Sequence, residues 1–246
     1  MDPQLPPRLV GVGVGPGDPE LVTLKAARVL AEADVILVPQ TDAASEGRAE
    51  TIVRAVHPDA VARIVRLPFS MALGGRRSTA RTDAWASAGD AVAQAFAGGA
   101  SLVVFATIGD PSVYSTFSYL AGAVRERVPE VVVEVVPGVT AMQALAAASG
   151  RPLVEGDEIL ALVPLKGGID ALVNVAPEVD SIVVYKPGRH FAELADYLAS
   201  MEADAIVGID VGPPSELIAP VAALDGAPYF ATVLWTPERD EIGGRL

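Results

Sequence analysis

Short runs of apolar residues alternate along the chain with stretches in which apolar residues recur every three or four positions. The runs are rich in Val, Ile and Leu and are bounded by Gly, Pro and Asp. This pattern favours buried strands of a parallel sheet. In the first half of the chain we expect strands at residues 9–15, 35–38, 62–67, 102–107 and 131–136.

Two of the intervening stretches have clear helical periodicity. The apolar face of the first comprises Leu21, Leu24, Arg28 and Ala31, with Leu30 beside them. The face of the second comprises Val113, Phe117, Leu120 and Val124. Strands that alternate with helices predict an open, doubly wound sheet for this half.

A second set of strands is expected at residues 159–163, 181–185, 205–209 and 229–235. We place the boundary between the two sets near residues 137–150. The fold class is therefore α/β, with two α/β domains at residues 1–137 and 138–246 and a cleft expected between them. Residues 70–82 contain two glycines and three arginines and predict a mobile loop.

Composition narrows the functions that such a fold could serve. Hydrophobic residues make up 51% of the chain, and no apolar run is long enough to span a bilayer. The first residues lack the pattern of a secretory signal, so a cytoplasmic protein with no membrane partner is expected. The chain has no cysteine and two histidines, and we expect no protein-bound metal. A net charge of −13 argues against a nucleic-acid partner.

The first candidate loop is Gly11-Val-Gly-Val-Gly-Pro-Gly-Asp18, between the first strand and the first helix. Backbone N–H groups at such a position can face a ligand. The loop does not form the dinucleotide fingerprint GxGxxG, because the sixth position is Pro16 when counted from Gly11 and Asp18 when counted from Gly13. No acidic residue ends the second strand either. A nicotinamide-dependent dehydrogenase is therefore disfavoured. Asp18 is expected to cap a helix, with Pro19 at its first position.

Two further loops have similar chemistry. Ile108-Gly109-Asp110-Pro111 follows an apolar strand, and Asp-Pro is expected to begin the next helix; Asp110 could cap that helix or meet a ligand. In residues 136–142 a Pro-Gly turn precedes a third helix, where Thr140 could contact a ligand or help to start the helix. Ligands of open α/β sheets bind at the carboxyl ends of strands, where these loops lie. A protein that only binds, or one that has lost its cofactor, could keep such loops.

Several segments together resemble the tetrapyrrole (corrin/porphyrin) methylase family. They are VGVGPGDPELVTLKAARVL, TIGDPSVYSTFSYL and VEVVPGVTAMQALAAASGRPLVEGDEIL, followed by YKPGRHFAEL and PYFATVLW. The resemblance covers essentially the whole chain. Within the family, the second and third segments are most similar to precorrin-2 C20-methyltransferases of cobalamin (vitamin B12) synthesis. The resemblance thus implies C20 methylation of precorrin-2 to precorrin-3A, with the cobalt-containing substrate of the anaerobic route, or another corrin-ring methyltransferase, as alternatives. A diphthine synthase fits the motifs less well, and the acidic charge of the chain argues against an rRNA ribose methyltransferase.

The resemblance also implies the cofactor and its contacts. Family members hold S-adenosyl-L-methionine largely through main-chain groups in the cleft between two domains. The matching positions in this chain are Pro16, Gly109, Asp110, Val113, Thr140, Ala141, Tyr185, Lys186 and Gly212. Lys186 stands where the family often has an apolar residue. This departure from the family pattern suggests that Lys186 faces the substrate instead of the cofactor. The family is commonly homodimeric, and a homodimer is expected here.

The implied reaction requires the loss of the C20 proton, so one general base is plausible. Asp110 and Lys186 are the candidates, and solvent is the rival. The tetrapyrrole substrate has many carboxylates, so we expect a local basic lining in this acidic protein. The candidates are Arg76, Arg77, Arg81, Lys166, Arg189 and His190. A solvated charged loop, and a helix-start role for His190, are the simpler alternatives.

Overall fold

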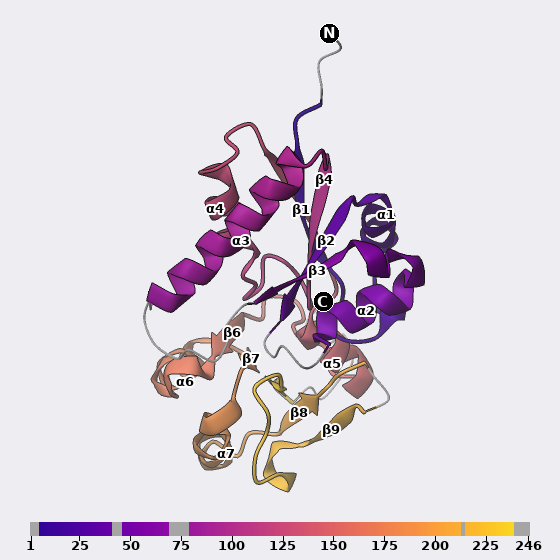
Figure 1. Cartoon of the computed structure of the whole chain (residues 1–246). Coiled ribbons are helices and arrows are strands. Elements are labelled where there is room, and N and C mark those ends of the chain that lie inside the picture. Colours follow the sequence, from indigo (N-terminus) through magenta and orange to yellow (C-terminus); the bar gives the residue numbers. More distant parts are fainter. Residues whose placement is uncertain (1–4, 41–45, 69–78, 213–214, 239–246) are drawn as a thin grey trace. The chain divides into compact units, whose positions relative to one another are not determined.

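The computed structural model describes residues 5–40, 46–68, 79–212 and 215–238, with the backbone alone for residues 79–81. The chain forms two compact units, Met1–Thr140 and Ala141–Leu246. Each unit has its own sheet, and each is considered separately (Figure 1).

The first unit contains a five-stranded sheet in the order β3-β2-β4-β1-β5, in which all neighbours are parallel. The strands are β1 (Arg8–Gly13), β2 (Val35–Gln40), β3 (Ile64–Pro68), β4 (Leu102–Thr107) and β5 (Val132–Val136). All six residues of the central strand β4 are buried. The predicted parallel sheet is thus confirmed, and its most apolar run lies at its centre.

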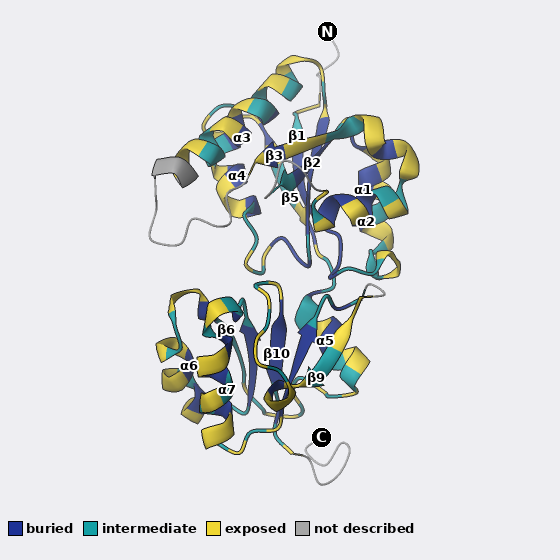
Figure 2. Cartoon of the chain, turned by 60° about the horizontal axis from the view of Figure 1, so that its bottom comes forward, coloured by how far each residue is buried: buried dark blue, intermediate teal, exposed yellow. Residues whose placement is uncertain are grey.

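Helices cover both faces of this sheet. On one face, α1 (Leu24–Glu32) and α2 (Arg48–Val56) pack into one core. On the other, α3 (Thr79–Ala97) and α4 (Phe117–Arg125) pack into a second (Figure 1). Short 3₁₀ helices, η1 (Pro19–Leu21) and η2 (Pro58–Arg63), precede α1 and β3. The doubly wound arrangement is confirmed, and in Figure 2 the inner strands β1, β2 and β4 are largely buried between helices whose outer faces are exposed.

The first predicted helical face is wrong. Leu24 is 91% exposed, and the buried residues of α1 are Ala26, Val29 and Leu30. Asp18 caps a helix as expected, but that helix is η1; the Asp18 side chain accepts from the Glu20 amide at 2.8 Å. Thr23 caps α1 instead. The 3₁₀ turn shifts the helix start, and so turns a different face toward the sheet.

Two other helix starts differ from expectation. Helix α4 begins at Phe117, well after Asp110-Pro111, so Val113 lies in the preceding loop while Phe117, Leu120 and Val124 are buried as predicted. Helix α3 begins at Thr79, inside the stretch expected to be a loop, and Arg81 is therefore helical. The rest of that stretch up to residue 78, with Arg76 and Arg77, lies outside the described residues.

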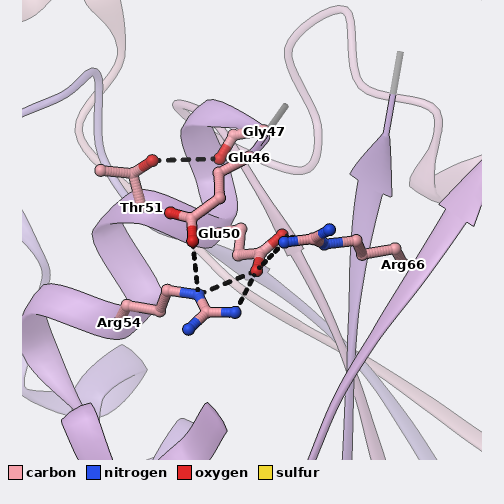
Figure 3. A network of polar contacts seen from close by, with 6 residues as sticks. All are labelled: Glu46, Gly47, Glu50, Thr51, Arg54 and Arg66. Atoms are coloured by element: carbon pink, nitrogen blue, oxygen red, sulfur yellow. Dashed lines mark hydrogen bonds and ion pairs between the residues drawn. The ribbon is translucent and has the colours of Figure 1, made fainter. Parts of the chain in front are cut away.

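A buried carboxylate joins α2 to the edge strand β3 (Figure 3). Glu50 on α2 is fully buried and accepts from Arg54, one helical turn on, at 2.6 Å, and from Arg66 on β3 at 2.7 Å. The hydrogen bond from Arg66 lowers the pKa of Glu50 most; burial opposes it, and Arg54 lowers it further. Glu46 adds a longer contact to Arg54, 3.4 Å. This network lies at the β3 edge of the sheet, the edge opposite β5.

The second unit has a mixed sheet in the order β6-β7-β10-β8-β9. Its strands are β6 (Leu160–Pro164), β7 (Ser181–Tyr185), β8 (Ala205–Ile209), β9 (Leu217–Pro220) and β10 (Thr232–Trp235). Strands β6 and β7 are parallel, and the other pairs are antiparallel. The sequence predicted four of these strands and missed β9, a four-residue edge strand that ends in proline and has no buried residue.

Helix α5 (Ala141–Ser149) lies on one face of this sheet, and α6 (Asp170–Val175) and α7 (Phe191–Ser200) lie on the other (Figure 2). Leu145 of α5 packs so closely on β8 that a Cβ at Gly208 would lie 2.8 Å from it. The 3₁₀ helices η3 (Leu165–Gly167), η4 (Ala176–Glu178), η5 (Gly188–His190) and η6 (Val221–Ala223) connect the elements. Two α/β units were predicted, and this fold class is confirmed. Among the described residues, no helix combines the length and the apolar character needed to cross a membrane.

Candidate functional site

The carboxyl ends of β4, β1 and β5 lie next to one another in the first sheet. The loops that follow these strands, residues 14–18, 108–116 and 137–140, therefore share one edge. They are the three loops that the sequence singled out. In open α/β sheets this edge is where ligands bind.

Glycine backbones hold these loops together. A Cβ at Gly13 would lie 2.4 Å from the Gly109 carbonyl oxygen and 2.7 Å from the Gly138 nitrogen. A Cβ at Gly138 would in turn lie 2.3 Å from the same carbonyl oxygen. No side chain fits at either position, so the three loops meet through their main chains. Gly13 and Gly138 belong to the sequence motifs, but they were not among the predicted site residues.

Hydrogen bonds complete the junction. The Gly109 amide donates to the Gly15 carbonyl at 2.8 Å, and the Val14 amide donates to the Thr107 carbonyl at 2.9 Å. Both Gly15 and Gly109 adopt left-handed backbone, with φ of +79° and +67°. Glycine populates this region without the steric penalty of a Cβ, so the two loops can approach closely.

The Asp110 carboxylate ties the second loop to the third. One oxygen accepts from the Gly138 amide at 2.9 Å, and the other accepts from the Ser112 amide at 2.7 Å and from the Ser112 hydroxyl. Burial raises the pKa of Asp110, but these hydrogen bonds outweigh it and hold the pKa below its usual value. The buried carboxylate is therefore ionised at neutral pH, and both of its oxygens already accept from this protein's own donors.

The other candidates of the first unit surround this junction. Pro16 is buried beside Gly15, and Thr140 is 6% exposed at the end of the third loop. A Cβ on Gly109 would lie 3.8 Å from the Thr140 Cα, an ordinary contact. Val113 is half-buried, and its amide donates to the Asp110 carbonyl at 3.2 Å. The structure thus brings together Pro16, Gly109, Asp110, Val113 and Thr140.

In the second unit, the carboxyl ends of β6, β7 and β8 lie on one edge of the mixed sheet, together with the start of β10. Tyr185 ends β7, and Gly212 lies shortly after β8, where its amide donates to Glu216 at 2.8 Å. Lys186 and Asp210, directly after β7 and β8, both have left-handed backbone, with φ of +60° and +50°. Ala141 begins α5 of this unit.

An aromatic pair stands beside Lys186. The Lys186 ammonium nitrogen lies 5.6 Å from the centre of the Tyr229 ring, within the range of a cation–π interaction. Tyr229 and Phe230 meet edge to face at 5.2 Å, and Phe230 is 43% exposed. The sequence contained this pair in PYFATVLW, but nothing in its local pattern linked it to Lys186.

Three of the basic candidates lie on the same edge. Lys166 is in η3 after β6; Arg189 and His190 are in η5 after β7; and these two 3₁₀ helices are neighbours. The Arg189 guanidinium donates to the His190 ring at 3.1 Å, and that ring lies 3.3 Å from Glu193. His190 also directly precedes α7, consistent with the helix-start alternative. Arg76 and Arg77 lie outside the described residues, and nothing is described of the Arg81 side chain.

The first-unit edge has the features that a cationic, main-chain-bound cofactor requires. The three loops meet there through glycine main chains, with Thr140 close by, and the edge holds the ionised carboxylate of Asp110, which favours nearby positive charge. S-adenosyl-L-methionine carries a sulfonium and an ammonium group, and a nearby ionised carboxylate favours such positive charge.

The fold is that of an α/β protein in which three glycine-bearing loops meet at the carboxyl edge of a parallel sheet. The chain belongs to the family of Tetrapyrrole (Corrin/Porphyrin) Methylases, which matches residues 8–222. The sequence-based resemblance to this family is confirmed.

Similar proteins support this membership. The chain is 34% identical over 237 residues to the precorrin-2 C(20)-methyltransferase of Sinorhizobium sp, covering 92% of this chain and 94% of that protein. It is 36% identical over 181 residues to a probable cobalt-precorrin-2 C(20)-methyltransferase of Methanocaldococcus jannaschii, covering 73% and 72% of the two chains. The solved structure of the uroporphyrin-III C-methyl transferase from Thermus thermophilus, complexed with S-adenyl homocysteine, superposes with a TM-score of 0.66. Its identity is 25%, and the match covers 93% of this chain and 92% of that one.

Proposed function

We propose that this protein transfers a methyl group from S-adenosyl-L-methionine to C20 of precorrin-2, giving precorrin-3A in cobalamin biosynthesis. Family membership supports the reaction type, and the similarity to the Sinorhizobium enzyme along nearly the whole of both chains supports the position methylated. The structural observation that carries the proposal is the three-loop glycine junction closed by Asp110, because it forms an edge lined by main chain.

The chain's own groups would hold the methyl donor at two edges. In the first unit these are Pro16, Gly109, Val113 and the Thr140 region, with Asp110 supplying negative charge. In the second unit they are Ala141, Tyr185, Lys186 and Gly212. The S-adenosyl homocysteine complex of the Thermus relative supports this cofactor.

When bound, the donor supplies an activated methyl group on a sulfonium leaving group. The protein then has to align that methyl with C20, because the C20–methyl bond forms as the methyl–sulfur bond breaks. Orientation of this kind supplies about 7–11 kcal/mol of barrier reduction. This chemistry requires no strongly nucleophilic side chain, which agrees with a chain without cysteine.

The C20 proton leaves after methyl transfer, and its acceptor is a separate question. Asp110 and Lys186 were the predicted candidates. The hydrogen bonds to both oxygens of Asp110 favour a positioning role for that carboxylate. Lys186 and solvent therefore remain the better candidates for the acceptor, and the base role of each residue stays a prediction.

The substrate carboxylates require cationic partners. Lys166, Arg189 and His190 lie together at the edge of the second sheet, which supports their predicted role. Arg76, Arg77 and Arg81 stay predictions from sequence, as does the homodimer.

The cobalt-containing substrate of the anaerobic route is the second candidate. The similarity to the Methanocaldococcus protein favours it, although that match covers less of both chains. Both substrates would present the same C20 carbon, so the same contacts serve either reaction.

The test incubates the purified protein with S-adenosyl-L-methionine and either precorrin-2 or cobalt-factor II, each with a control that lacks the methyl donor. Mass spectrometry is expected to show one added methyl group for one of the two macrocycles, and NMR is expected to place it on C20. Methylation at another carbon would contradict the C20 assignment. No methylation of either macrocycle would contradict the proposed function itself.

A further inference from the structure

Non-glycine residues with left-handed backbone occur at four described positions, and three of them follow strand ends. They are Tyr114, Lys186, Glu202 and Asp210. Glu202 is the exception: it follows α7, where its amide donates to the Ala199 carbonyl and the next amide donates to Leu198. Such a residue is an ordinary helix end. Lys186 and Asp210 follow β7 and β8, and Tyr114 lies in the loop after β4.

Tyr114 is the least expected of these residues. Its φ is +51°, a conformation that bulky side chains rarely adopt. Glycine or asparagine would make the same turn with less strain. Strained backbone of this kind concentrates at functional sites. The position therefore raises the question of what the tyrosine side chain contributes.

Hydrogen bonds fix the loop on both sides of Tyr114. Before it, the Ser112 amide and the Val113 amide donate to the side chain and the carbonyl of Asp110. After it, the Ser115 hydroxyl donates to the Thr107 hydroxyl at 3.2 Å and accepts from the Phe117 amide at 3.2 Å. The surrounding contacts thus impose the left-handed conformation and hold Tyr114 in place.

Tyr114 is 41% exposed, in a loop at the carboxyl edge of the parallel sheet, so this aromatic residue is partly accessible there. Burial of the remainder raises the pKa of the phenol, which keeps the side chain neutral. A neutral ring can pack against a flat conjugated surface without the cost of burying a charge.

We propose that Tyr114 contacts the face of the tetrapyrrole macrocycle and positions it for methyl transfer. This inference rests on the proposed function and adds a substrate contact to it. The loop presents the ring from the residues that follow Gly109 and Asp110, and the macrocycle, a large system of four linked pyrrole-derived rings, is the partner of the proposed reaction that offers an extended face. Tyr114 is thus a substrate-positioning residue that lies outside the set of cofactor contacts.

The test compares Tyr114→Gly and Tyr114→Phe with wild type. Glu202→Gly is the matched control, because it relieves the same left-handed backbone conformation at the end of α7, outside the loops at the carboxyl edges of the two sheets. Binding of precorrin-2 and of cobalt-factor II is measured by absorbance titration, S-adenosyl-L-methionine binding by calorimetry, and kcat and KM by methyl transfer to the macrocycle that the wild-type protein methylates. Thermal unfolding verifies that each variant is folded.

Tyr114→Gly is expected to raise the Kd and KM for the macrocycle by about 5-fold or more while the Kd for S-adenosyl-L-methionine stays within about 2-fold. Tyr114→Phe should stay within about 2-fold of wild type for both ligands, because the ring carries the contact. Glu202→Gly should leave both affinities and both kinetic constants unchanged.

Unchanged macrocycle affinity in Tyr114→Gly would overturn the inference, as would a Phe variant as weak as the Gly variant. An equal loss of affinity for the methyl donor would also overturn it, because it would indicate a general disturbance of the loop. A wild-type protein that methylates neither precorrin-2 nor cobalt-factor II would overturn the proposed function, which is a distinct result.

Discussion

Replacing Asp110 with Asn tests whether this carboxylate positions the loops or takes part in proton transfer. Its two oxygens accept from the amides of Ser112 and Gly138 and from the Ser112 hydroxyl, and the residue is 7% exposed. In the Asn variant one oxygen becomes an NH₂ group that faces an N–H donor. The lost charge-assisted hydrogen bond and the unsatisfied buried donor together should cost about 2–4 kcal/mol of folding stability.

The neighbouring loop provides a matched control. Asp18 also stands in a Gly-Asp-Pro sequence, but it caps an exposed 3₁₀ helix by accepting from the Glu20 amide. Asparagine caps helices as well as aspartate does, so Asp18→Asn should change stability by less than about 0.5 kcal/mol. Urea unfolding measures both variants. Calorimetry should show weaker S-adenosyl-L-methionine binding for Asp110→Asn alone, because only that variant releases the third loop.

The pH dependence follows from the direction of the pKa shift. The pKa of Asp110 is lower in the folded protein than its ordinary value of 3.8, so the unfolded chain binds a proton more readily. The advantage of wild type over Asp110→Asn should therefore be complete above pH 3.8 and decline as the pH falls below it. A variant with wild-type stability and cofactor affinity, but a reduced kcat that no longer depends on pH as the wild-type kcat does, would refute the positioning role and support a base.

Two further substitutions test the first sheet and its loops. Glu50→Gln should destabilise the protein by about 3 kcal/mol, because the buried carboxylate accepts from both Arg54 and Arg66, whereas Glu32→Gln in an exposed pair should cost less than about 0.5 kcal/mol. Because the pKa of Glu50 is lowered on folding, urea unfolding should show the Glu50→Gln difference shrinking below pH 4.5; a constant difference would contradict this reasoning. Gly13→Ala should cost about 3 kcal/mol and weaken cofactor binding, since its Cβ would lie 2.4 Å from a carbonyl oxygen. The control is Gly122→Ala on α4, where the new methyl meets open space; it should raise the free energy of unfolding by about 1 kcal/mol. Equal effects of the two substitutions in urea unfolding would argue against the loop junction.

The sequence was a good guide to strands because their signal is local. The observed bounds Leu102–Thr107, Ser181–Tyr185 and Ala205–Ile209 coincide with the predicted ones. In each of these segments a buried apolar run ends at a polar or turn-forming residue. The helix starts were less predictable. Asp18 and Thr23 are both good capping residues, and only packing decides which of them precedes the α-helix and hence whether Leu24 faces the sheet or solvent.

The site could be predicted as three loops but not as a junction. Glycines after strands are visible in any sequence, and ligands of open parallel sheets bind at the carboxyl ends of the strands. The contact of Gly13 with Gly138, by contrast, depends on the register of strands far apart in the chain. The left-handed conformation of Tyr114 is equally hidden, because hydrogen bonds to Asp110 and Thr107 impose it from both sides and its own side chain disfavours it.

The acidic character of the chain does not conflict with a substrate that has many carboxylates. At physiological ionic strength the Debye length is about 8 Å, so distant surface charges are largely screened and the local lining decides the sign of the ligand. Many of the described arginines already contact acidic partners, as Arg54 and Arg66 do with Glu50 and Arg8 does with Glu134. Arg189 instead donates to the imidazole of His190, beside Lys166 at the strand ends. A positive lining at this edge would act over distances at which the remaining negative charge of the protein is already weak, so the acidity of the whole chain is compatible with the proposed contacts of Lys166, Arg189 and His190 with substrate carboxylates.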